Sequence, residues 1–208
     1  MQPERLSFQK QKFSGDIMSK RAEGKTVAIL AADGFEEVEL TSPKEALENA
    51  GASCIIVSLE SGEIQANQHR EHGIKVKVDK TVDEVKADDF DALLIPGGLF
   101  NPDTLRQSDK VLDFTSKFFA QAKPVFSICH GPQVLITANL VDGRKMTGFA
   151  AIQQDLKNAG AIVSDEEVVV DKGLVTSRNP NDLPAFNDKI VEELCEGKHE
   201  AQKESVEA

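Results

Sequence analysis

A cysteine and a histidine stand side by side in the stretch PVFSICHGP, residues 124–132. A thiolate is a good nucleophile and an imidazole titrates near neutral pH, so this pair could carry out nucleophilic catalysis. The apolar run before Cys129 predicts a strand, and Gly131 with Pro132 predicts a tight turn into a helix, whose free N–H groups favour a thiolate. The opposing interpretation is a buried structural thiol, the commoner role of a free cysteine.

Apolar runs that alternate with helical patterns must position this pair. Several of the runs are continuously apolar, as expected of strands that are covered on both faces. The alternation predicts an α/β protein with a doubly wound, mostly parallel sheet sandwiched by helices. The runs at 74–80 and 166–172 alternate differently, and we expect hairpin or edge strands there. The strands of the main sheet are expected at residues 26–32, 53–59, 91–98, 124–129 and 173–178.

Three helices are marked by their spacing or by their caps. Ser42-Pro43-Lys44-Glu45 is a capping-box pattern, so a helix is expected to begin there and to end at Gly51. Apolar residues keep helical spacing over 111–122 and over 183–194, and Asp182 is the expected N-cap of the latter helix.

Three chemically distinctive loops follow the first, third and fourth of the predicted strands. They are ADGFEEVEL at 32–40, PGGLFNPD at 96–103 and CHGP at 129–132. Doubly wound sheets bind ligands beyond the carboxyl ends of their strands, so an acidic loop, a glycine pair and a thiol would share one crevice. This convergence favours a functional Cys129 over a structural one.

These motifs, taken in order along the chain, resemble the DJ-1/PfpI superfamily, and SICHGPQVLITA is similar to its PfpI-type intracellular protease and general stress protein branch. The resemblance runs from about Lys25 to Leu194 and includes GFEEVEL, DALLIPGG, ICHGPQ, GRKMTG and LVTSRNPNDLPAFN. It implies a flavodoxin-like sandwich of the class I glutamine amidotransferase type, a homodimer or higher homo-oligomer, and a cysteine held in a strained elbow between strand and helix.

The resemblance also implies a role for each residue that matches a family motif. Cys129 matches the nucleophile, and Glu39 matches a carboxyl group that hydrogen-bonds the sulfur and is useful when protonated. The first two glutamates of GFEEVEL fit a solvated face better. His130 matches a general base and acid, although neighbours in sequence can diverge at a turn. The N–H groups of Gly98 and His130 match an oxyanion hole, while glycines are also what a tight turn needs.

Asp103 is the nearest match to an acidic residue that a neighbouring subunit supplies in the peptidase relatives. This chain has aspartate where the thermophilic peptidases have glutamate, and one extra residue in the loop. Both departures argue against a Cys-His-acid triad and against peptidase activity.

Other candidate groups suggest no further chemistry. His69 and His72 lack an evident third ligand, so no metal site is expected. PGG is not followed by the Gly-Lys-Ser/Thr of a phosphate loop, and no cofactor is expected. Cys54 and Cys195 are expected to be structural, which leaves Cys129 as the strongly nucleophilic thiol, with a pKa below the ~8.5 of free cysteine.

Composition limits the partners and the domain organisation. The 208-residue chain carries a formal net charge of -11, which argues against a nucleic-acid backbone binder. No run approaches the ~18 apolar residues of a membrane span. Three widely spaced cysteines and no secretory signal favour the cytoplasm. We expect a flexible N-terminal extension at 1–24, one folded domain at 25–196 and a frayed tail at 197–208.

Three functions fit these residues. The first is a stress-related, cysteine-dependent hydrolase or lyase of deglycase or glyoxalase type, acting on a small carbonyl compound such as methylglyoxal or on a glycated protein. An intracellular peptidase would use the same groups through a thioester. A redox sensor or holdase chaperone would instead use oxidation of Cys129 without turnover.

Overall fold

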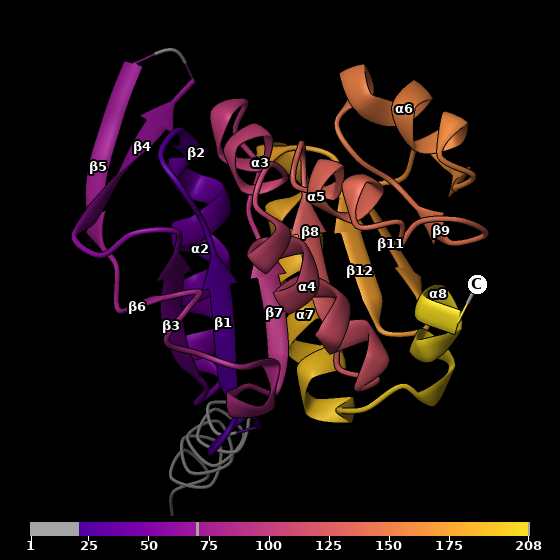
Figure 1. Ribbon diagram of the computed structural model, residues 1–208, viewed down its shortest axis with the longest axis horizontal. Helices are drawn as coiled ribbons and strands as arrows, with labels where there is room; N and C mark the ends of the chain where they lie inside the picture. The colour runs from indigo at the N-terminus through magenta and orange to yellow at the C-terminus, as the bar shows by residue number, and fades with distance from the viewer. Residues whose placement is uncertain (1–20, 70, 208) are drawn as a thin grey trace, which may run out of the picture.

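A seven-stranded sheet forms the centre of the protein (Figure 1) in a computed structural model that describes residues 21–69 and 71–207. The strand order is β11-β12-β8-β7-β1-β3-β6, and every neighbouring pair in it is parallel except β11 with β12. This arrangement confirms the predicted doubly wound sheet. The strands are β1 (Thr26–Leu30), β3 (Ser53–Ser58), β6 (Lys80–Thr81), β7 (Ala92–Ile95), β8 (Val125–Ile128), β11 (Val168–Asp171) and β12 (Leu174–Ser177).

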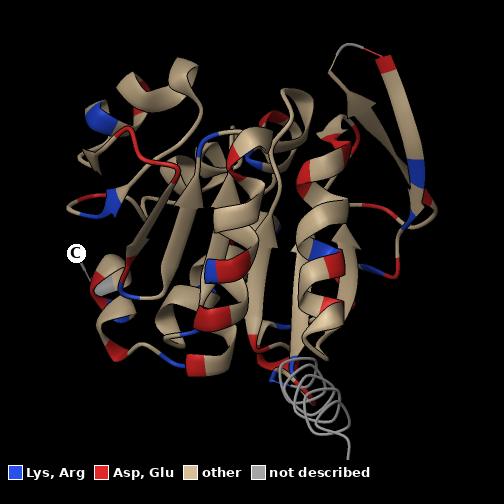
Figure 2. Ribbon diagram, turned by 180° about the vertical axis from the view of Figure 1, so that it is seen from behind, with Lys and Arg blue, Asp and Glu red and all other residues tan. Residues whose placement is uncertain are grey.

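Helices cover both faces of this sheet and create two apolar cores. On one face α2 and α7 lie side by side (Figure 2), and the Asn187 side-chain amide donates to Ser42 Oγ over 2.8 Å between them. On the other face α4 and α5 bury residues such as Phe118 and Leu135 against the strands. The helices are α2 (Glu37–Asn49), α3 (Phe100–Leu105), α4 (Asp109–Ala120), α5 (Pro132–Thr137), α6 (Gln153–Asn158), α7 (Leu183–Glu196) and α8 (Glu204–Glu207), with 3₁₀ turns η1 (Ala87–Asp89), η2 (Ala150–Ile152), η3 (Pro180–Asp182) and η4 (Glu200–Lys203).

Short strands extend the structure at its edges, as the two differently alternating runs predict. One run forms β5, which pairs antiparallel with β4 in a small sheet of order β2-β4-β5. The other forms β11, the antiparallel edge strand of the main sheet. The remaining strands are β2 (Phe35–Glu36), β4 (Glu63–Gln68), β5 (Glu71–Lys77), β9 (Lys145–Met146) and β10 (Ile162–Val163).

Helix α2 begins earlier than its capping pattern predicts. It starts at Glu37, directly after β2, so that Pro43 lies inside the helix rather than in its first turn. Proline has no N–H to donate, and the carbonyl of Glu39 four residues earlier therefore loses its helical donor. The additional turn carries Glu39 into the interior, where it is fully buried. The predicted start at Ser42 is thus wrong by more than one helical turn.

The segment after α7 forms helical turns where the composition predicts a frayed tail. Gln202 is fully buried, its side-chain N–H donates to the Lys123 carbonyl at 2.8 Å, and its Oε1 accepts from Arg144 at 2.9 Å. The Arg144 guanidinium also donates to Ser205 Oγ. This segment is held by hydrogen bonds between its polar side chains and buried polar groups of the domain. A search for an apolar stripe in the sequence therefore misses that the segment is packed.

The predicted flexible extension lies mostly outside the described residues, since it covers 1–24. Its last residues are packed: Ala22 is fully buried and its N–H donates to the Ala50 carbonyl at 2.8 Å, beside the end of α2. No helix in the described part of the chain is long and apolar enough to cross a bilayer.

Candidate active site

Cys129 occupies a strained elbow between β8 and α5. Its φ of 61° lies in the left-handed region, which a residue with a Cβ rarely adopts. The backbone is fixed on both sides, because the Cys129 N–H donates to the Ser177 carbonyl at 3.0 Å and its carbonyl accepts from the Phe149 N–H at 2.9 Å. At Gly131 a Cβ would lie 2.6 Å from the Ile95 carbonyl oxygen, so the turn requires glycine. The elbow implied by the sequence resemblance is therefore present.

Glu39 places a buried carboxyl group beneath this elbow. It is fully buried, and its Oε2 accepts a 2.9 Å hydrogen bond from the Gly97 N–H, while Oε1 has no partner among the described residues. Burial raises the pKa of Glu39 to about 8 and the Glu36 charge adds to the rise, while the nearby Cys129 side chain and the Gly97 N–H oppose it. Glu39 is consequently protonated at neutral pH, and its free oxygen can carry a hydrogen for donation.

The Cys129 thiol differs from the low-pKa thiol expected from its sequence context. Burial is the main cause that raises the pKa of Cys129, and the neighbouring Glu39 carboxyl group adds to the rise, while the N–H groups of His130 and Gly98 oppose it. Only 7% of Cys129 is exposed, and α5 is a single short helix of 6 residues. Desolvation therefore outweighs the helix terminus, and we infer that the sulfur loses its proton only when a base accepts it.

His130 is placed to be that base. Its Nδ1 lies 3.3 Å from Cys129 Sγ, so the two neighbours do converge at the turn. The ring stacks on Phe149 with a centroid distance of 4.7 Å and an interplanar angle of 29°. Burial lowers the pKa of His130, which keeps the imidazole neutral and able to accept a proton at pH 7.

The glycine pair lets backbone N–H groups approach the thiol. A Cβ on Gly97 would lie 2.7 Å from the Cβ of Cys129 and 2.9 Å from the His130 nitrogen, so no larger residue fits. Gly98 has a φ of 85°, and its N–H and that of His130 both lower the pKa of the Cys129 thiol. Their role as an oxyanion hole stays a prediction.

Asn101 supports the glycine turn and is a residue that the sequence reasoning missed. Its side-chain amide donates to the carbonyls of Pro96 and Gly97 at 2.8 and 3.2 Å, and its Oδ1 accepts from the Ala32 N–H at 2.7 Å. Asn101 is fully buried and thereby joins the loops that follow β1 and β7. An asparagine after PGG is common in loops, so the sequence carried no signal of this bridging role.

A cavity of about 460 Å³ opens above Cys129. It brings together four residues predicted from the sequence: the thiol, the imidazole, the buried carboxyl and Gly98. Apolar and amide groups form the remainder of the wall together with one carboxylate and one further imidazole, so the cavity suits a small polar molecule with some apolar surface. The further lining residues are Glu36, His69, Leu99, Phe149, Asn179, Pro180 and Asn181.

Glu36 and His69 meet at the rim of this cavity. The backbone N–H of His69 donates to both carboxylate oxygens of Glu36 at 3.2 Å, and the ring Nδ1 of His69 lies 3.7 Å from Glu36 Oε1. The interaction brings the loop after β4 onto the start of α2. His69 therefore belongs to the rim, whereas His72 lies on β5 outside the cavity lining.

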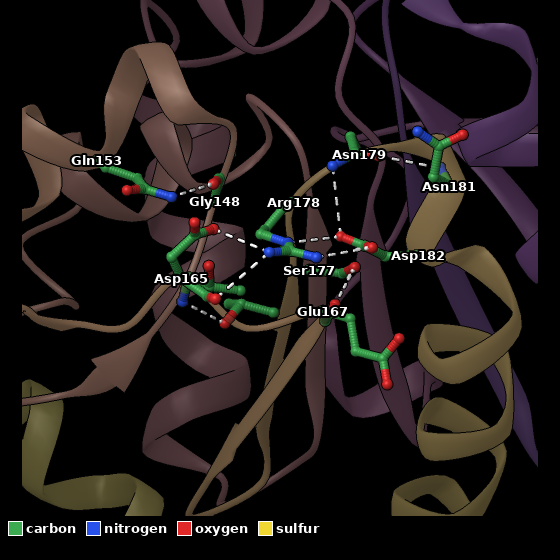
Figure 3. A network of polar contacts seen from close by, with 11 residues as sticks. Gly148, Gln153, Asp165, Glu167, Ser177, Arg178, Asn179, Asn181 and Asp182 are labelled. Carbon is green, nitrogen blue, oxygen red and sulfur yellow. Dashed lines mark hydrogen bonds and ion pairs between the residues drawn. The ribbon is translucent and has the colours of Figure 1, made fainter.

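Arg178 holds the opposite rim in place (Figure 3). Its guanidinium donates to both oxygens of Asp182, at 2.8 and 3.0 Å, and to Asp165 at 2.9 Å. Asn179 donates to Asp182 at 3.4 Å and accepts from the Asn181 N–H at 3.0 Å, so the lining turn is tied to the same carboxylate. Asp182 is the N-cap residue of α7, as predicted, but its side chain makes no capping hydrogen bond, because its oxygens accept from Arg178.

The other predicted residues lie outside the cavity. Asp103 is exposed on α3 and does not line the cavity, so its role with a neighbouring subunit stays a prediction. Cys54 lies on β3, where burial raises its pKa to about 12. Cys195 is half-buried on α7, with its sulfur 3.4 Å from the Arg21 carbonyl oxygen. Both positions fit the expected structural roles.

A buried cysteine in a strand-to-helix elbow, backed by a protonated carboxyl, defines a thiol-centred α/β protein. The chain belongs to the DJ-1/PfpI family, whose sequence pattern matches residues 25–193.

Individual relatives cover most of the same region. The chain is 52% identical over 163 residues to "Putative cysteine protease YraA" of Bacillus subtilis, with 78% of this chain and 94% of that one covered. It is 48% identical over 164 residues to "Protein/nucleic acid deglycase 2" of Escherichia coli, again with 78% and 94% covered. A two-domain protein of Anabaena variabilis with DJ-1/ThiJ/PfpI-like and ferritin-like domains superposes with a TM-score of 0.77 and 38% identity, covering 82% of this chain and 48% of that one.

Proposed function

We propose that this protein is a cysteine-dependent hydrolase or lyase that acts on carbonyl compounds in the manner of a deglycase or glyoxalase. The observation that carries the proposal is the 3.3 Å contact between Cys129 Sγ and His130 Nδ1 beside a carboxyl group that is protonated at neutral pH. A thiol that transfers its proton to a neighbouring base only as it reacts is suited to reversible addition to an aldehyde. The deglycase relative supports the same chemistry.

The first step is addition of the thiol to the carbonyl. The S–H bond breaks as the S–C bond forms, and the proton passes to His130. The carbonyl oxygen becomes an oxyanion, which the N–H groups of Gly98 and His130 stabilise. Protonated Glu39, on the buried side of the sulfur, would donate its hydroxyl hydrogen to it in a hydrogen bond. All the groups that this step requires converge on one cavity.

The conversion of a 2-oxoaldehyde into a 2-hydroxy acid needs no external oxidant. His130 first returns its proton to the oxyanion, which gives a neutral hemithioacetal. His130 then takes the proton from the former aldehyde carbon and delivers it to the neighbouring carbonyl carbon, while the hydroxyl proton moves to the neighbouring oxygen, and a 2-hydroxyacyl thioester forms. Water cleaves the thioester, releases a 2-hydroxy acid and restores the thiol. The sum of these steps is the substrate plus one water, so atoms and electrons balance.

Peptidase activity is the second candidate, and the name of the 52% identical relative favours it. It would use the same thiol, base and oxyanion donors to form a thioester with a peptide. The exposed side chains of Leu99 and Phe149 could contact an extended chain at the open rim. Asp103 does not reach this cavity within one chain, so a triad would depend on a second subunit.

A substrate panel separates these candidates. Methylglyoxal, a glycated peptide and casein are each incubated with the protein, and product is counted per active site. We expect more than one product per site from methylglyoxal or the glycated peptide and negligible cleavage of casein. Free thiols form hemithioacetals, so equimolar glutathione is the control for trapping. Casein cleavage alone would favour the peptidase, and at most one equivalent of product would favour the redox sensor or chaperone.

We also propose that the protein is at least a homodimer. Leu99 and Phe100 are 61% and 60% exposed beside the cavity, and an apolar pair of this kind is typical of a subunit contact. Light scattering at micromolar concentration is expected to give at least twice the monomer mass. A monomer mass would contradict the assembly and would remove any role for Asp103 across an interface.

A further inference from the structure

Three metal-ligating side chains meet where α7 ends, outside the cavity that Cys129 lines. Glu193 and Glu196 lie one turn apart on the helix, and His199 follows after the chain reverses at Gly197, which has a φ of 86°. One ligand atom from each of the three lies within 4.8 Å of the others. Within residues 21–69 and 71–207 this is the one group of three or more such side chains that meets that spacing.

The atoms at the centre of this group lack hydrogen-bond partners. Glu193 is 5% exposed, and its Oε2 lies 3.1 Å from Nε2 of His199. Neither atom makes a hydrogen bond with any described residue, because the contact between them lacks hydrogen-bond geometry. The two atoms lie at ion-pair distance, but buried polar atoms are normally hydrogen-bonded, so a contact without a hydrogen bond leaves both atoms able to bind a cation. Ligand atoms at about 2.0–2.2 Å from one tetrahedral metal ion lie roughly 3.3 Å apart, close to the observed separation.

The surroundings hold His199 in position for such a partner. Its N–H donates to the Ala122 carbonyl at 2.7 Å, and its carbonyl accepts from the Gln202 N–H at 2.8 Å. The ring lies over Gly173, where a Cβ would come within 2.7 Å of it, so only glycine leaves it room. The carboxyl end of a 14-residue helix also favours positive charge. Glu196 is exposed and provides a path for an ion to enter.

We propose that Glu193, Glu196 and His199 form a binding site for a divalent transition-metal ion, with Zn²⁺ as its representative. Two carboxylate oxygens and one imidazole nitrogen are common zinc ligands, and water would complete the coordination. The ion would connect the end of α7 to the segment that carries Gln202. Figure 1 shows the chain leaving α7 at the bottom of the view, away from α3 and α5 at the top. This site departs from the expectation of no metal drawn from the sequence.

Zinc titration of chelator-treated protein tests the proposal. Calorimetry of the full chain is expected to show one equivalent of bound Zn²⁺ at pH 7.5. Glu196→Gln should bind at least about tenfold more weakly, since even the loss of an outer partner of a ligand costs that much. Glu196 is exposed, so this variant should keep the unfolding temperature of the wild type in the presence of a chelator. Zn²⁺ should raise the unfolding temperature of the wild type and leave that of Glu196→Gln unchanged.

Two controls make the outcome decisive. Glu192→Gln removes the same charge from the adjacent turn, where Glu192 pairs with Lys189, and it should bind Zn²⁺ as the wild type does. Cys129→Ser removes the other plausible zinc ligand and should also leave binding unchanged. If the wild type takes up no zinc, or if Glu196→Gln binds as tightly as the wild type, the contact is a histidine–glutamate pair only and the proposal fails. Binding lost in Cys129→Ser but kept in Glu196→Gln would likewise overturn it.

Discussion

Turnover of methylglyoxal is expected to disappear in Cys129→Ser and to fall by about 10²–10⁴-fold in His130→Ala. The serine variant keeps the shape of the elbow but replaces the thiol by a hydroxyl, which a single imidazole at this site ionises poorly. The alanine variant keeps the sulfur and removes the group 3.3 Å from it that takes its proton. Initial rates of 2-hydroxy acid formation, counted per active site, measure both losses.

The matched control is Cys195→Ser, which makes the same atomic change outside the cavity and should keep full activity. The pH dependence gives a second test of His130. Because burial lowers the pKa of His130, the fall of kcat/KM on the acid side should lie below its ordinary value of about 6.5. That acid limb should be absent from the residual activity of His130→Ala. Unchanged turnover in Cys129→Ser or in His130→Ala would contradict the proposed mechanism.

The wild type is expected to lose stability relative to Glu39→Gln as the pH rises from 4.5 to 8. The pKa of Glu39 is about 8 in the folded protein and about 4.5 when the chain is unfolded. A raised folded-state pKa means that the stabilising contribution is complete below the unfolded value and is lost as the pH rises through the folded one. Glutamine stays neutral throughout. The two stability curves should diverge with rising pH by several kcal/mol, on the order of 4.

Urea unfolding of both proteins at pH 5, 7 and 9 measures this divergence. Glu45→Gln is the control, because Glu45 is an exposed carboxyl on the same helix and its replacement should leave the pH dependence unchanged. The divergence should persist in a Cys129→Ser background, since burial is the main cause of the raised pKa. Parallel curves for the wild type and Glu39→Gln would show that Glu39 is ionised in the folded protein at neutral pH.

Local sequence patterns were sufficient for the long strands of the main sheet and for the Cys129-His130 pair, and the family resemblance added Glu39 and Gly98. Cys129 and His130 are adjacent in the chain, and Gly98 and Glu39 follow predicted strands whose ends must meet at one edge of the sheet. The rest depends on packing between distant segments. The stacking of Phe149 on His130 and the support from Asn101 join loops that no local pattern connects. The thiol pKa could not be predicted because it depends on how completely the folded chain excludes water from the sulfur.

The left-handed backbone at Cys129 has a consequence for the evolution of this protein. A residue with a Cβ in that conformation costs about 1–2 kcal/mol, which glycine would avoid. The elbow is clamped by Ser177 and Phe149, so the strain cannot relax while cysteine remains. Selection for the thiol must therefore outweigh a standing pressure toward glycine at this position. A duplicated copy of the gene that no longer needed the thiol would be expected to lose Cys129 to glycine early, before the surrounding fold decays.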